Sequence, residues 1–524
     1  MNMPNSFSVI YDSRLPPCNA QCPSGHDIQG WLAQAAQGEY RRAWEIMMDN
    51  NPLPATMGRV CYHTCEGACN RKEFDQAVNI HALERFIGDL ALKEGWQVTP
   101  AAASGKKILV VGAGPGGLSA AYHLARLGHS VTIAEAGPRA GGMMAFGIPS
   151  YRLPRNILDG EIKRIVNLGV TIQLDTRVDD IPAAIEAGGY DACFAAVGAH
   201  LAKQVDLGTV DHTLAVIDAV AFLRAMATNP EPKKPGRKVV VYGGGNTAID
   251  VARTVLRLGA EEVRIVYRRN RARMPAHRFE VEEALEEGVI LSDLRTIKHL
   301  GHGQICLETM AIAGDGSLQG TGATESIAAD SLILALGQDV DTALFHAIPG
   351  IQIAKDGAIS VGADFQTGHA GVFVGGDMIS AERTVTVAIG HGKKAARYID
   401  AWLRGAMQTT PPKKDLAGFD RINPMFYPRS SPVSEPRISL EARQTSFAEV
   451  VGDLTVRAAL KEAKRCLSCG NCLHCDDCLN LCPDKAIRKT EDGGYAVDPT
   501  MCRHCGLCIA QCPCGMIHMG ATIA

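Results

Sequence analysis

Apolar residues follow different patterns along the chain, and the changes between them suggest its organisation. Residues 27–48 carry apolar side chains at helical spacing, between loops that contain cysteine. From Lys106 the pattern changes to short apolar runs, ILVV and VVVY, each followed by a glycine turn and a helical segment. Such strand–turn–helix units are typical of parallel sheets covered by helices. Residues 405–445 are rich in Pro, Ser, Thr and Arg, which predicts a linker on the protein surface.

Composition and charge narrow the classes of function. The 524 residues are 46% hydrophobic and 21% charged, as in ordinary soluble globular proteins. The chain has 53 Lys and Arg residues against 56 Asp and Glu residues, which gives a net charge of −3. It therefore lacks the excess of positive charge that favours nucleic-acid binding. No apolar run is long enough to span a membrane. The beginning of the chain also lacks the positively charged region followed by an apolar region that is typical of a signal peptide. We therefore expect a cytoplasmic protein with no membrane span and no nucleic-acid partner.

The first glycine turn has the form G-x-G-x-x-G, with glycines at Gly112, Gly114 and Gly117. Gly112 allows a tight turn, Gly114 lets the backbone approach a pyrophosphate, and Gly117 permits close packing of helix on strand. The next predicted strand ends at Glu135, 23 residues after Gly112, where an acid would bond ribose hydroxyls. Strand, helix and acid together predict a dinucleotide site, although a glycine turn alone would be weak evidence.

A second turn of this kind has the form G-x-G-x-x-A. It runs from Gly243 through Gly245, Asn246 and Thr247 to Ala248, between a predicted strand and a predicted helix. The same physical reasons predict a second dinucleotide site here. The chain would then hold two dinucleotide-binding domains, the second inserted within the first.

The strand after the second turn ends in Arg268 and Arg269, where an NAD site would have an acid. A carboxylate would bond the ribose 2′-hydroxyl and repel a 2′-phosphate, whereas guanidinium groups bind the phosphate with charge-assisted hydrogen bonds. This favours NADPH over NADH. The alternative is a solvated basic end of a strand.

The segment FVGGDM, with the helical segment that follows it, resembles the closing motif of flavoproteins with two dinucleotide domains. In those proteins the Asp contacts the flavin ribityl or phosphate group, and the next helix begins near the flavin ring. The resemblance implies that the first glycine site holds FAD and the second holds the nicotinamide. The further cofactor-binding residues that we expect are Gly142, Gly376, Asp377 and Thr386.

A disulfide reductase is the rival function within this fold class. It would need a redox-active cysteine pair beside the flavin. Outside the two ends of the chain the only cysteines are Cys193 and Cys306, which are solitary and far apart in sequence. The sequence therefore argues against this function.

Sixteen of the 18 cysteines lie near the two ends of the chain, which in a cytoplasmic protein indicates metal rather than disulfides. The C-terminal part contains the run C-x2-C-x2-C-x3-C-P twice, and this doubled run is the signature of a ferredoxin with two [4Fe–4S] clusters. In such a ferredoxin the fourth cysteine of each run binds the other cluster. One ligand set is then Cys472, Cys475, Cys478 and Cys512, and the other is Cys482, Cys502, Cys505 and Cys508.

Residues 15–404 resemble the small subunit of glutamate synthase and related flavin and iron–sulfur oxidoreductases. The matching text includes PPCNAQCPSGHDIQGWL, MGRVCYHTCEGACNR, GGGNTAIDVAR and GGDMISAERTVTVAIGHGKKAA. The chain departs from the family in one respect: a segment resembling FAEV…EAKRCLSC usually precedes PPC, but here it occupies residues 447–469. Half of one cluster-binding unit has moved to the other end of the chain.

The resemblance implies two further clusters. One would use Cys18, Cys69, Cys466 and Cys469. The other would use Cys22, Cys61, Cys65 and a fourth ligand that is Glu or Gln in the family, for which Glu84 is the candidate. The alternatives are that Glu84 is a solvent-facing helical residue and that Cys466 and Cys469 bind no iron. Fifteen cysteines and one glutamate would suffice for four clusters, although the cysteine spacings also permit other registers.

These observations predict an α/β fold with two Rossmann-like domains, for FAD and NADPH, flanked by a helical iron–sulfur domain and a bacterial ferredoxin-like domain. The expected boundaries are 1–104 for the helical domain, 105–235 and 336–404 for the FAD domain, 236–335 for the NAD(P)H domain, 405–445 for the linker, 446–470 for the segment completing the helical domain, and 471–524 for the ferredoxin domain.

No catalytic acid–base residues are needed, because the cofactors carry the chemistry. We expect an enzyme subunit that moves electrons between NADP(H), FAD and [4Fe–4S] clusters, to or from a partner oxidoreductase or ferredoxin in a hetero-oligomer. The alternatives are a glutamate synthase small subunit or a free-standing ferredoxin:NADP reductase, and a non-enzymatic redox scaffold, against which both intact nucleotide motifs argue.

Overall fold

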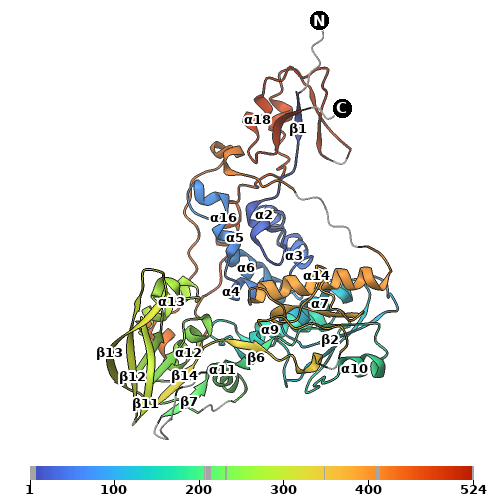
Figure 1. Ribbon diagram of the computed structural model, residues 1–524. Helices are drawn as coiled ribbons and strands as arrows, with labels where there is room; N and C mark the ends of the chain where they lie inside the picture. The colour runs from blue at the N-terminus through green and yellow to red at the C-terminus, as the bar shows by residue number, and fades with distance from the viewer. Residues whose placement is uncertain are drawn as a thin grey trace. The chain divides into compact units, whose positions relative to one another are not determined.

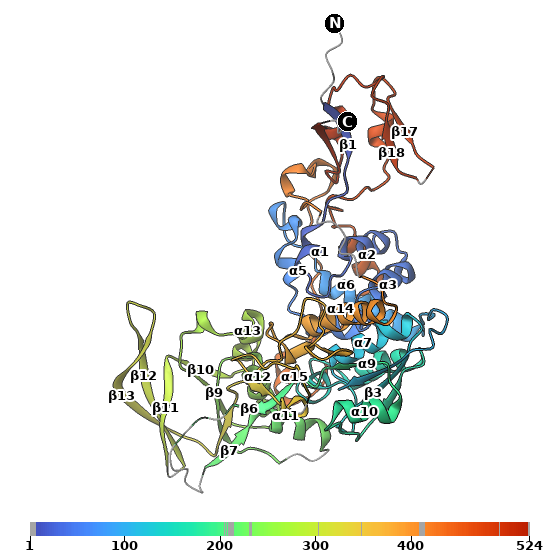
Figure 2. The same cartoon turned by 45° about the vertical axis from the view of Figure 1, so that its right-hand side comes forward.

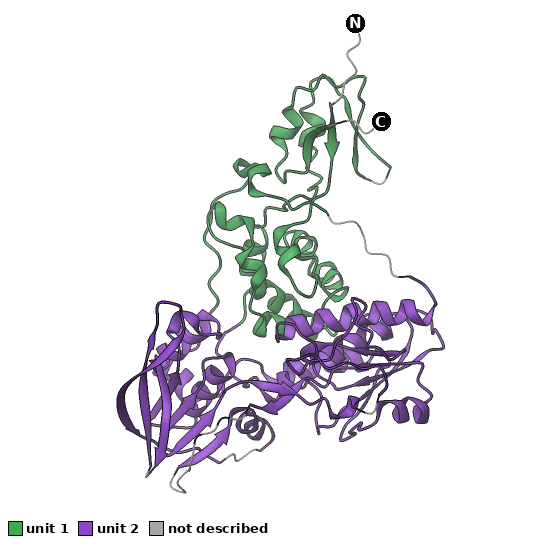
Figure 3. Ribbon diagram, viewed as in Figure 1, with its two compact units in different colours: residues 1–96, 408–435, 453–524 green, residues 97–407, 436–452 purple. Residues whose placement is uncertain are grey.

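The computed structural model describes residues 7–203, 205, 207, 214–229, 233–301, 303–346, 348–407, 414–491 and 493–521. Contacts between Cα atoms divide the chain into two compact units (Figure 3). Unit 1 contains residues 1–96, 408–435 and 453–524, and unit 2 contains residues 97–407 and 436–452. The chain therefore passes between the units four times. Within the described residues, no helix is both long enough and apolar enough to cross a membrane.

The first sheet of unit 2 is parallel, with strand order β16-β5-β2-β3-β4. Its central strand is buried on both faces, and Ile108 and Val110 are fully inaccessible, as expected for a sheet covered by helices. Helices α7 and α14 pack against each other beside it (Figure 1). The elements are β2 (Lys107–Val111), β3 (Ser130–Ala134), β4 (Thr171–Gln173), β5 (Ala192–Ala195), β16 (Val372–Val374), α7 (Pro115–Arg126), α8 (Met143–Phe146), α9 (Arg155–Val166), α10 (Ile181–Gly188) and α14 (Val385–Leu403).

The second sheet of unit 2 has the order β10-β9-β8-β14-β7 and is also parallel. Its elements are β7 (Ala215–Asp218), β8 (Lys238–Tyr242), β9 (Glu262–Tyr267), β10 (Ile290–Asp293), β14 (Ser331–Leu334), α11 (Ala219–Thr228), α12 (Asn246–Arg257) and α13 (Arg278–Glu286). The expected boundary at residue 236 differs from this arrangement, because β7 pairs with β14 and the side chains of α11 join the same core.

Two smaller β-structures complete unit 2 (Figure 2). An antiparallel sheet has the order β11-β12-β13, and a two-stranded ribbon pairs β6 with β15. Their strands are β6 (Ala199–Ala202), β11 (Arg295–Gly301), β12 (Gln304–Ile312), β13 (Leu318–Ala328) and β15 (Gln338–Val340).

The helical part of unit 1 is held together by close helix packing around fully buried Trp31 and Trp44. Helices α4 and α6 approach so closely that a Cβ at Gly88 would lie 2.3 Å from the amide nitrogen of Ala55. Glycine is required at this crossing for that reason. The elements are α1 (Pro17–Gln21), α2 (Ile28–Ala35), α3 (Tyr40–Met48), α4 (Pro54–Val60), α5 (Thr64–Gly67), η1 (Asn70–Glu73), α6 (Ile80–Lys93) and α16 (Val456–Ala463).

The ferredoxin-like part of unit 1 contains a strand that the sequence analysis did not predict. Strand β1 (Phe7–Tyr11) pairs antiparallel with β19 (Ile517–Ala521), and Val9 lies opposite Met519. Val9 also packs into the core formed by Ile487, Ile517 and several cysteines. The remaining elements are α17 (Asp477–Asn480), β17 (Ile487–Lys489), β18 (Tyr495–Val497) and α18 (Leu507–Gln511).

The expected linker is ordered where the structure describes it. Leu416 forms a parallel bridge with Leu15, and η5 (Phe419–Arg421), η6 (Pro424–Phe426) and α15 (Leu440–Thr445) follow. Residues 436–452 belong to unit 2, where Gln444 donates to the carbonyl oxygen of Glu287 at 2.8 Å and Val450 donates to that of Tyr151 at 3.0 Å. The expected boundary at residue 446 therefore lies inside a segment that packs as a whole on unit 2.

Candidate cofactor sites

The first glycine turn has the backbone shape of a dinucleotide site. Gly112 has φ +100°, and a Cβ there would lie 2.7 Å from the carbonyl oxygen of Ala196. A Cβ at Gly117 would lie 1.9 Å from the oxygen of Gly112, which leaves no room for a side chain where α7 meets the strand. A Cβ at Gly114, in contrast, would meet nothing within 4 Å. The turn therefore has no room for side chains at Gly112 and Gly117, where it packs on the protein. It is open at Gly114, where a pyrophosphate would approach the start of α7.

Glu135 follows β3 and lies beside this turn. Its two carboxylate oxygens accept hydrogen bonds from the amides of Ala113 at 2.7 Å and Gly137 at 2.8 Å. These bonds hold the carboxylate at the carboxyl ends of the strands. Each oxygen keeps a further lone pair, so the group can still accept a hydrogen bond from a ribose hydroxyl.

Two other predicted flavin contacts approach the same turn, and two more lie on the segments that reach it from the C-terminal part of unit 2. A Cβ at Gly142 would lie 2.8 Å from the Cα of Gly114, and a Cβ at Gly116 would lie 3.7 Å from the Cα of Gly376. Asp377 comes next in the chain, and Thr386 is buried in the first turn of α14. The structure thus gathers sequence-distant segments around one turn.

The Asp377 carboxyl group suits a hydroxyl-rich ligand. Burial raises its pKa, and Arg383 and His200 only partly offset this effect. Within the described part of the chain this carboxyl group has no hydrogen-bonding partner. A partly buried carboxyl group of this kind would accept hydrogen bonds from ribityl hydroxyls of FAD.

The second glycine turn repeats these features. Gly243 has φ +147°, and a Cβ there would lie 2.2 Å from the oxygen of Ala335. A Cβ at Gly245 would meet nothing within 4 Å. Asn246 and Thr247 begin α12, and the Asn246 side-chain oxygen accepts from the amide of His277 at 2.9 Å. This turn therefore fits a second dinucleotide.

Arg268 and Arg269 directly follow β9 and are exposed. Neither side chain has a hydrogen bond or ion pair with another described residue. Two more exposed arginines, Arg271 and Arg273, lie on the following turn η2 (Arg271–Arg273). These two were not among the predicted site residues, although they lie in the same arginine-rich segment, YRRNRARMPA. Four guanidinium groups on one short loop provide a strongly cationic site for phosphate.

The two cysteine pairs from opposite ends of the chain meet in unit 1. Cys18, Cys69, Cys466 and Cys469 line one cavity. Burial raises the pKa of Cys18 well above its ordinary value, and Cys466, Cys69 and Cys469 raise it further. Burial likewise raises the pKa of Cys466 to about 11 and that of Cys469 to about 12. Four convergent thiols, two buried and two partly buried, fit a metal cluster, whose positive charge would stabilise the thiolates.

Arg465 fastens the C-terminal segment to the N-terminal one. It is buried and donates to the carbonyl oxygens of Ala77 at 2.9 Å and Gln76 at 2.6 Å, and it pairs with Glu462 and Asp75. Two further bonds reinforce this joint: Arg71 donates to the oxygen of Arg465 at 2.8 Å, and the amide of Asn79 donates to Glu462 at 2.8 Å. These hydrogen bonds and ion pairs form a polar joint between the two segments, made by Arg465, Glu462, Asp75 and Arg71. The joint brings the four cysteines together, although none of them is part of it.

Replacing this arginine tests the joint. We expect Arg465→Met to weaken unit 1 by about 3–5 kcal/mol, because it leaves the buried Glu462 without its cation. Iron bound at Cys18, Cys69, Cys466 and Cys469 should fall although all four ligands remain. Iron analysis and thermal unfolding measure both effects, with Arg457→Met on the exposed face of α16 as the control. Unchanged iron and stability would show that the joint is dispensable.

A second group in the helical part contains Cys22, Cys61, Cys65 and Glu84. Burial raises the pKa of Cys65, and Glu66, Cys61, Cys22 and Glu84 add to this shift, which places their charges around the Cys65 thiol. Glu84 is 7% exposed, so it is not a solvent-facing residue of α6. One of its oxygens accepts from the Asn51 side chain at 2.8 Å. The four predicted ligands therefore lie in one neighbourhood.

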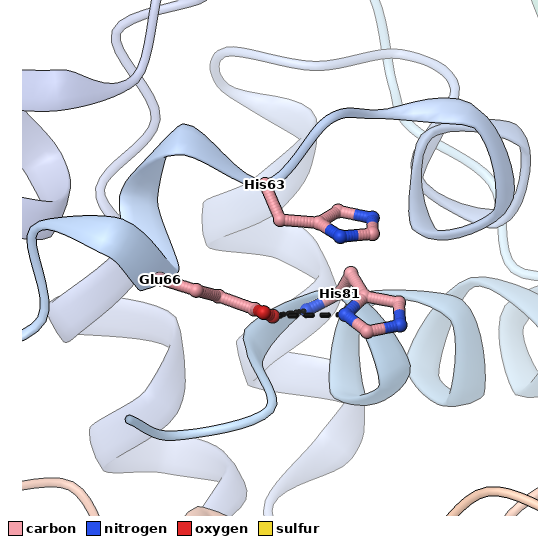
Figure 4. A group of neighbouring side chains, drawn as sticks. All are labelled: His63, Glu66 and His81. Carbon is pink, nitrogen blue, oxygen red and sulfur yellow. Dashed lines mark hydrogen bonds and ion pairs between the residues drawn. The ribbon is translucent and has the colours of Figure 1, made fainter. Parts of the chain in front are cut away.

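A histidine–glutamate cluster lies beside this group (Figure 4). The rings of His63 and His81 stack with centroids 3.7 Å apart. The His81 ring nitrogens contact Glu66 at 2.9 Å and Glu435 at 3.0 Å. Burial alone would lower the pKa of His81, but these two carboxylates raise it to about 10. The donor atoms of His63, Glu66 and His81 are close enough for a metal ion, and the two carboxylates that flank the His81 ring also suit an imidazolium.

The cysteine loops share an unusual backbone geometry. Four non-glycine residues two positions after a cysteine are left-handed, and each amide donates to the sulfur of that cysteine. They are His63 (φ 53°, 3.4 Å to Cys61), Ser468 (46°, 3.4 Å to Cys466), His474 (52°, 3.3 Å to Cys472) and His504 (57°, 3.4 Å to Cys502). Such strained loops persist at functional sites, and amides aimed at sulfur stabilise cluster thiolates. One loop of this kind occurs in each of the four predicted ligand groups.

The ferredoxin-like part brings together predicted ligands from its two cysteine runs. Cys482 lines one cavity with three cysteines of the other run, Cys502, Cys505 and Cys508. Burial raises the pKa of Cys472, and Cys512 of the second run adds to this effect. Cys475 and Cys478 follow Cys472 in the same loop. Cys514, which belongs to neither predicted set, has its sulfur 3.7 Å from that of Cys512.

The remaining two cysteines do not form a redox pair. Cys193 lies on β5 of the first sheet of unit 2, whereas Cys306 lies on β12 of the antiparallel sheet. Burial raises the pKa of Cys193 to about 12, which keeps its thiol unreactive. Their positions agree with the argument against a disulfide reductase.

Three parts of the chain match models of known protein families. Residues 106–392 match the family described as pyridine nucleotide-disulphide oxidoreductase, residues 11–96 match dihydropyrimidine dehydrogenase domain II with its 4Fe-4S cluster, and residues 471–516 match a 4Fe-4S dicluster domain. These matches confirm the expected cofactor classes, FAD, NADP(H) and [4Fe–4S] clusters, and the expected fold class.

Three curated relatives are similar over most of the chain. The chain is 36% identical to the NADP(+)-dependent formate dehydrogenase subunit beta of Moorella thermoacetica, over 86% of this chain and 70% of the relative. It is 34% identical to the NADPH-Fe(3+) oxidoreductase subunit beta of Geobacter sulfurreducens, over 89% and 77% respectively. It is 33% identical to the glutamate synthase [NADPH] small chain of Escherichia coli, over 74% and 89% respectively.

Proposed function

Because the chain belongs to the pyridine nucleotide-disulphide oxidoreductase family, we propose that it is the NADP(H)-linked subunit of a larger oxidoreductase, located in the cytoplasm. It is an NAD(P)H-dependent oxidoreductase with flavin and iron–sulfur cofactors. One observation carries the proposal: two glycine turns shaped for dinucleotides occur in one chain with four groups of predicted cluster ligands, two of which line cavities.

Each group of residues has a defined task in this proposal. Gly112–Gly117, Glu135 and Asp377 would hold FAD, and Gly243–Ala248 with Arg268 and Arg269 would hold NADPH. When bound, the nicotinamide supplies a two-electron hydride, the flavin converts it into single electrons, and the clusters carry these. The protein's contribution is to bind and orient these groups, because no acid–base pair of its own is required.

Two relatives are named as beta subunits, which supports a hetero-oligomer with a partner oxidoreductase. A glutamate synthase small subunit is the second candidate, supported by similarity to the E. coli small chain. The dicluster domain at residues 471–516 favours the first, because it adds two predicted clusters through which a partner could exchange electrons. Purification of the native complex tests the choice: co-purification of a glutamate synthase large subunit would overturn the first proposal.

Cofactor content is the most direct test of the ligand sets. We expect one FAD and about sixteen iron atoms per chain, as four [4Fe–4S] clusters require. Elemental analysis and flavin release from anaerobically purified protein measure both. About eight iron atoms would mean that only two of the four ligand groups hold clusters.

A further inference from the structure

The strand β1 places an aromatic residue from the beginning of the chain among the ferredoxin cysteines. Tyr11 is the last residue of β1 and lies opposite Ile517 of β19. The amide of Asp12 donates to the oxygen of Met516 at 3.1 Å, which continues the pairing beyond the strand. The Tyr11 ring stacks on that of Tyr495, with centroids 5.9 Å apart and planes at 17°. Both the backbone and the ring of Tyr11 are therefore fixed.

The hydroxyl group of Tyr11 is buried and has no hydrogen bond of normal geometry with any described residue. The Tyr11 side chain packs against a group of buried residues that includes Cys478, Cys508 and Cys512. The hydroxyl is therefore buried in a part of the molecule that is rich in cysteine sulfur. An unsatisfied buried hydroxyl is unfavourable and requires an explanation.

We propose that the Tyr11 hydroxyl donates a hydrogen bond to sulfur of the cluster held by Cys472, Cys475, Cys478 and Cys512, and thereby raises the reduction potential of that cluster. The inference rests on the proposed ligand set. Reduction adds negative charge to a cluster, and a hydrogen-bond donor stabilises the more negative state more strongly. Tyr11 is thus a positioning residue that acts on the potential and takes no part in bond chemistry.

The test uses the full-length holoprotein with Tyr11→Phe, which keeps the ring, its stacking on Tyr495 and the strand. We expect the reduction potential of one ferredoxin-type cluster to fall. At a fixed solution potential, the ratio of reduced to oxidised cluster should decrease about tenfold, which corresponds to about 59 mV for one electron. A redox titration followed by electron paramagnetic resonance measures it. Tyr40→Phe is the matched control, because this hydroxyl of unit 1 donates to the oxygen of Val456 and no cysteine contributes to the shift of its pKa.

A second variant keeps the inference testable if Tyr11→Phe loses the cluster. Incorporating 3-fluorotyrosine in place of Tyr11 makes the hydroxyl a stronger donor, and it should shift the same potential upward. Unchanged potentials in both variants, or a shift confined to the cluster of Cys482, Cys502, Cys505 and Cys508, would overturn the inference alone. Absence of ferredoxin-type iron from the unmodified protein would instead overturn the proposed function on which the inference rests.

Discussion

Cys466→Ser combined with Cys469→Ser is expected to remove one cluster and leave both ferredoxin-type clusters in place. The iron content should fall by about four atoms per chain, because one [4Fe–4S] cube loses two of its four ligands. These cysteines share a cavity with Cys18 and Cys69, so a site completed from both ends of the chain loses half of its donors. Electron transfer from flavin to partner should also slow. Iron analysis and spectra of the reduced protein measure the loss, and Cys306→Ser is the control.

A second double variant sharpens this test. Cys18→Ser with Cys69→Ser should remove the same four iron atoms, and combining all four substitutions should remove no more. Additive losses would mean that the two pairs serve different clusters. Unchanged iron and transfer rate after the first double substitution would show that the two ends do not share a cluster at all.

NADPH should reduce the flavin much faster than NADH, and Arg268→Ala with Arg269→Ala should abolish most of that preference. Both guanidinium groups are exposed and without protein partners among the described residues, so they are available for a 2′-phosphate. Losing charge-assisted bonds of about 1.5–3 kcal/mol predicts weaker NADPH binding on the order of a hundredfold, with NADH little changed. Stopped-flow reduction of the flavin at varied nucleotide concentration measures both.

Arg237→Ala provides the control for general loss of positive charge. Arg237 immediately precedes β8, at the end of the sheet opposite the glycine turns, and it pairs with Glu261. Its replacement should leave the preference for NADPH intact. Equal rates with both nucleotides in the unmodified protein would contradict the role given to the arginines.

Local sequence spacing predicted the parts of the molecule whose chemistry is local. A glycine turn between strand and helix needs only six residues, so Gly112–Gly117 and Gly243–Ala248 were recognisable before their backbone shape was known. The doubled cysteine run is equally local. The partners of Cys466 and Cys469 followed from family resemblance and not from spacing, because convergence of distant segments leaves no mark in either segment.

The elements that the sequence did not predict depend on distant partners. The segment FSVIY contains no chemical motif. It becomes strand β1 because it pairs with β19, which lies about 500 residues later in the chain. Residues 436–445 were predicted as linker and residues 446–452 as part of the helical domain, yet this whole segment packs on α12, α13 and the Tyr151 loop. Strand β7 likewise belongs to the second sheet because it fits beside β14, a pairing that its own four residues do not specify.

The separation of Cys69 from Cys466 has a consequence for biosynthesis. These residues are 397 positions apart, so the ribosome must add about three-quarters of the chain between them. At roughly 5–20 residues per second this takes on the order of 20–80 s, during which Cys18 and Cys69 have only half of the proposed ligand set. The Rossmann-like unit can form in that interval, whereas this cluster can be inserted only when translation is nearly complete. Truncated chains that end before Cys466 would therefore carry nucleotide sites but never this cluster.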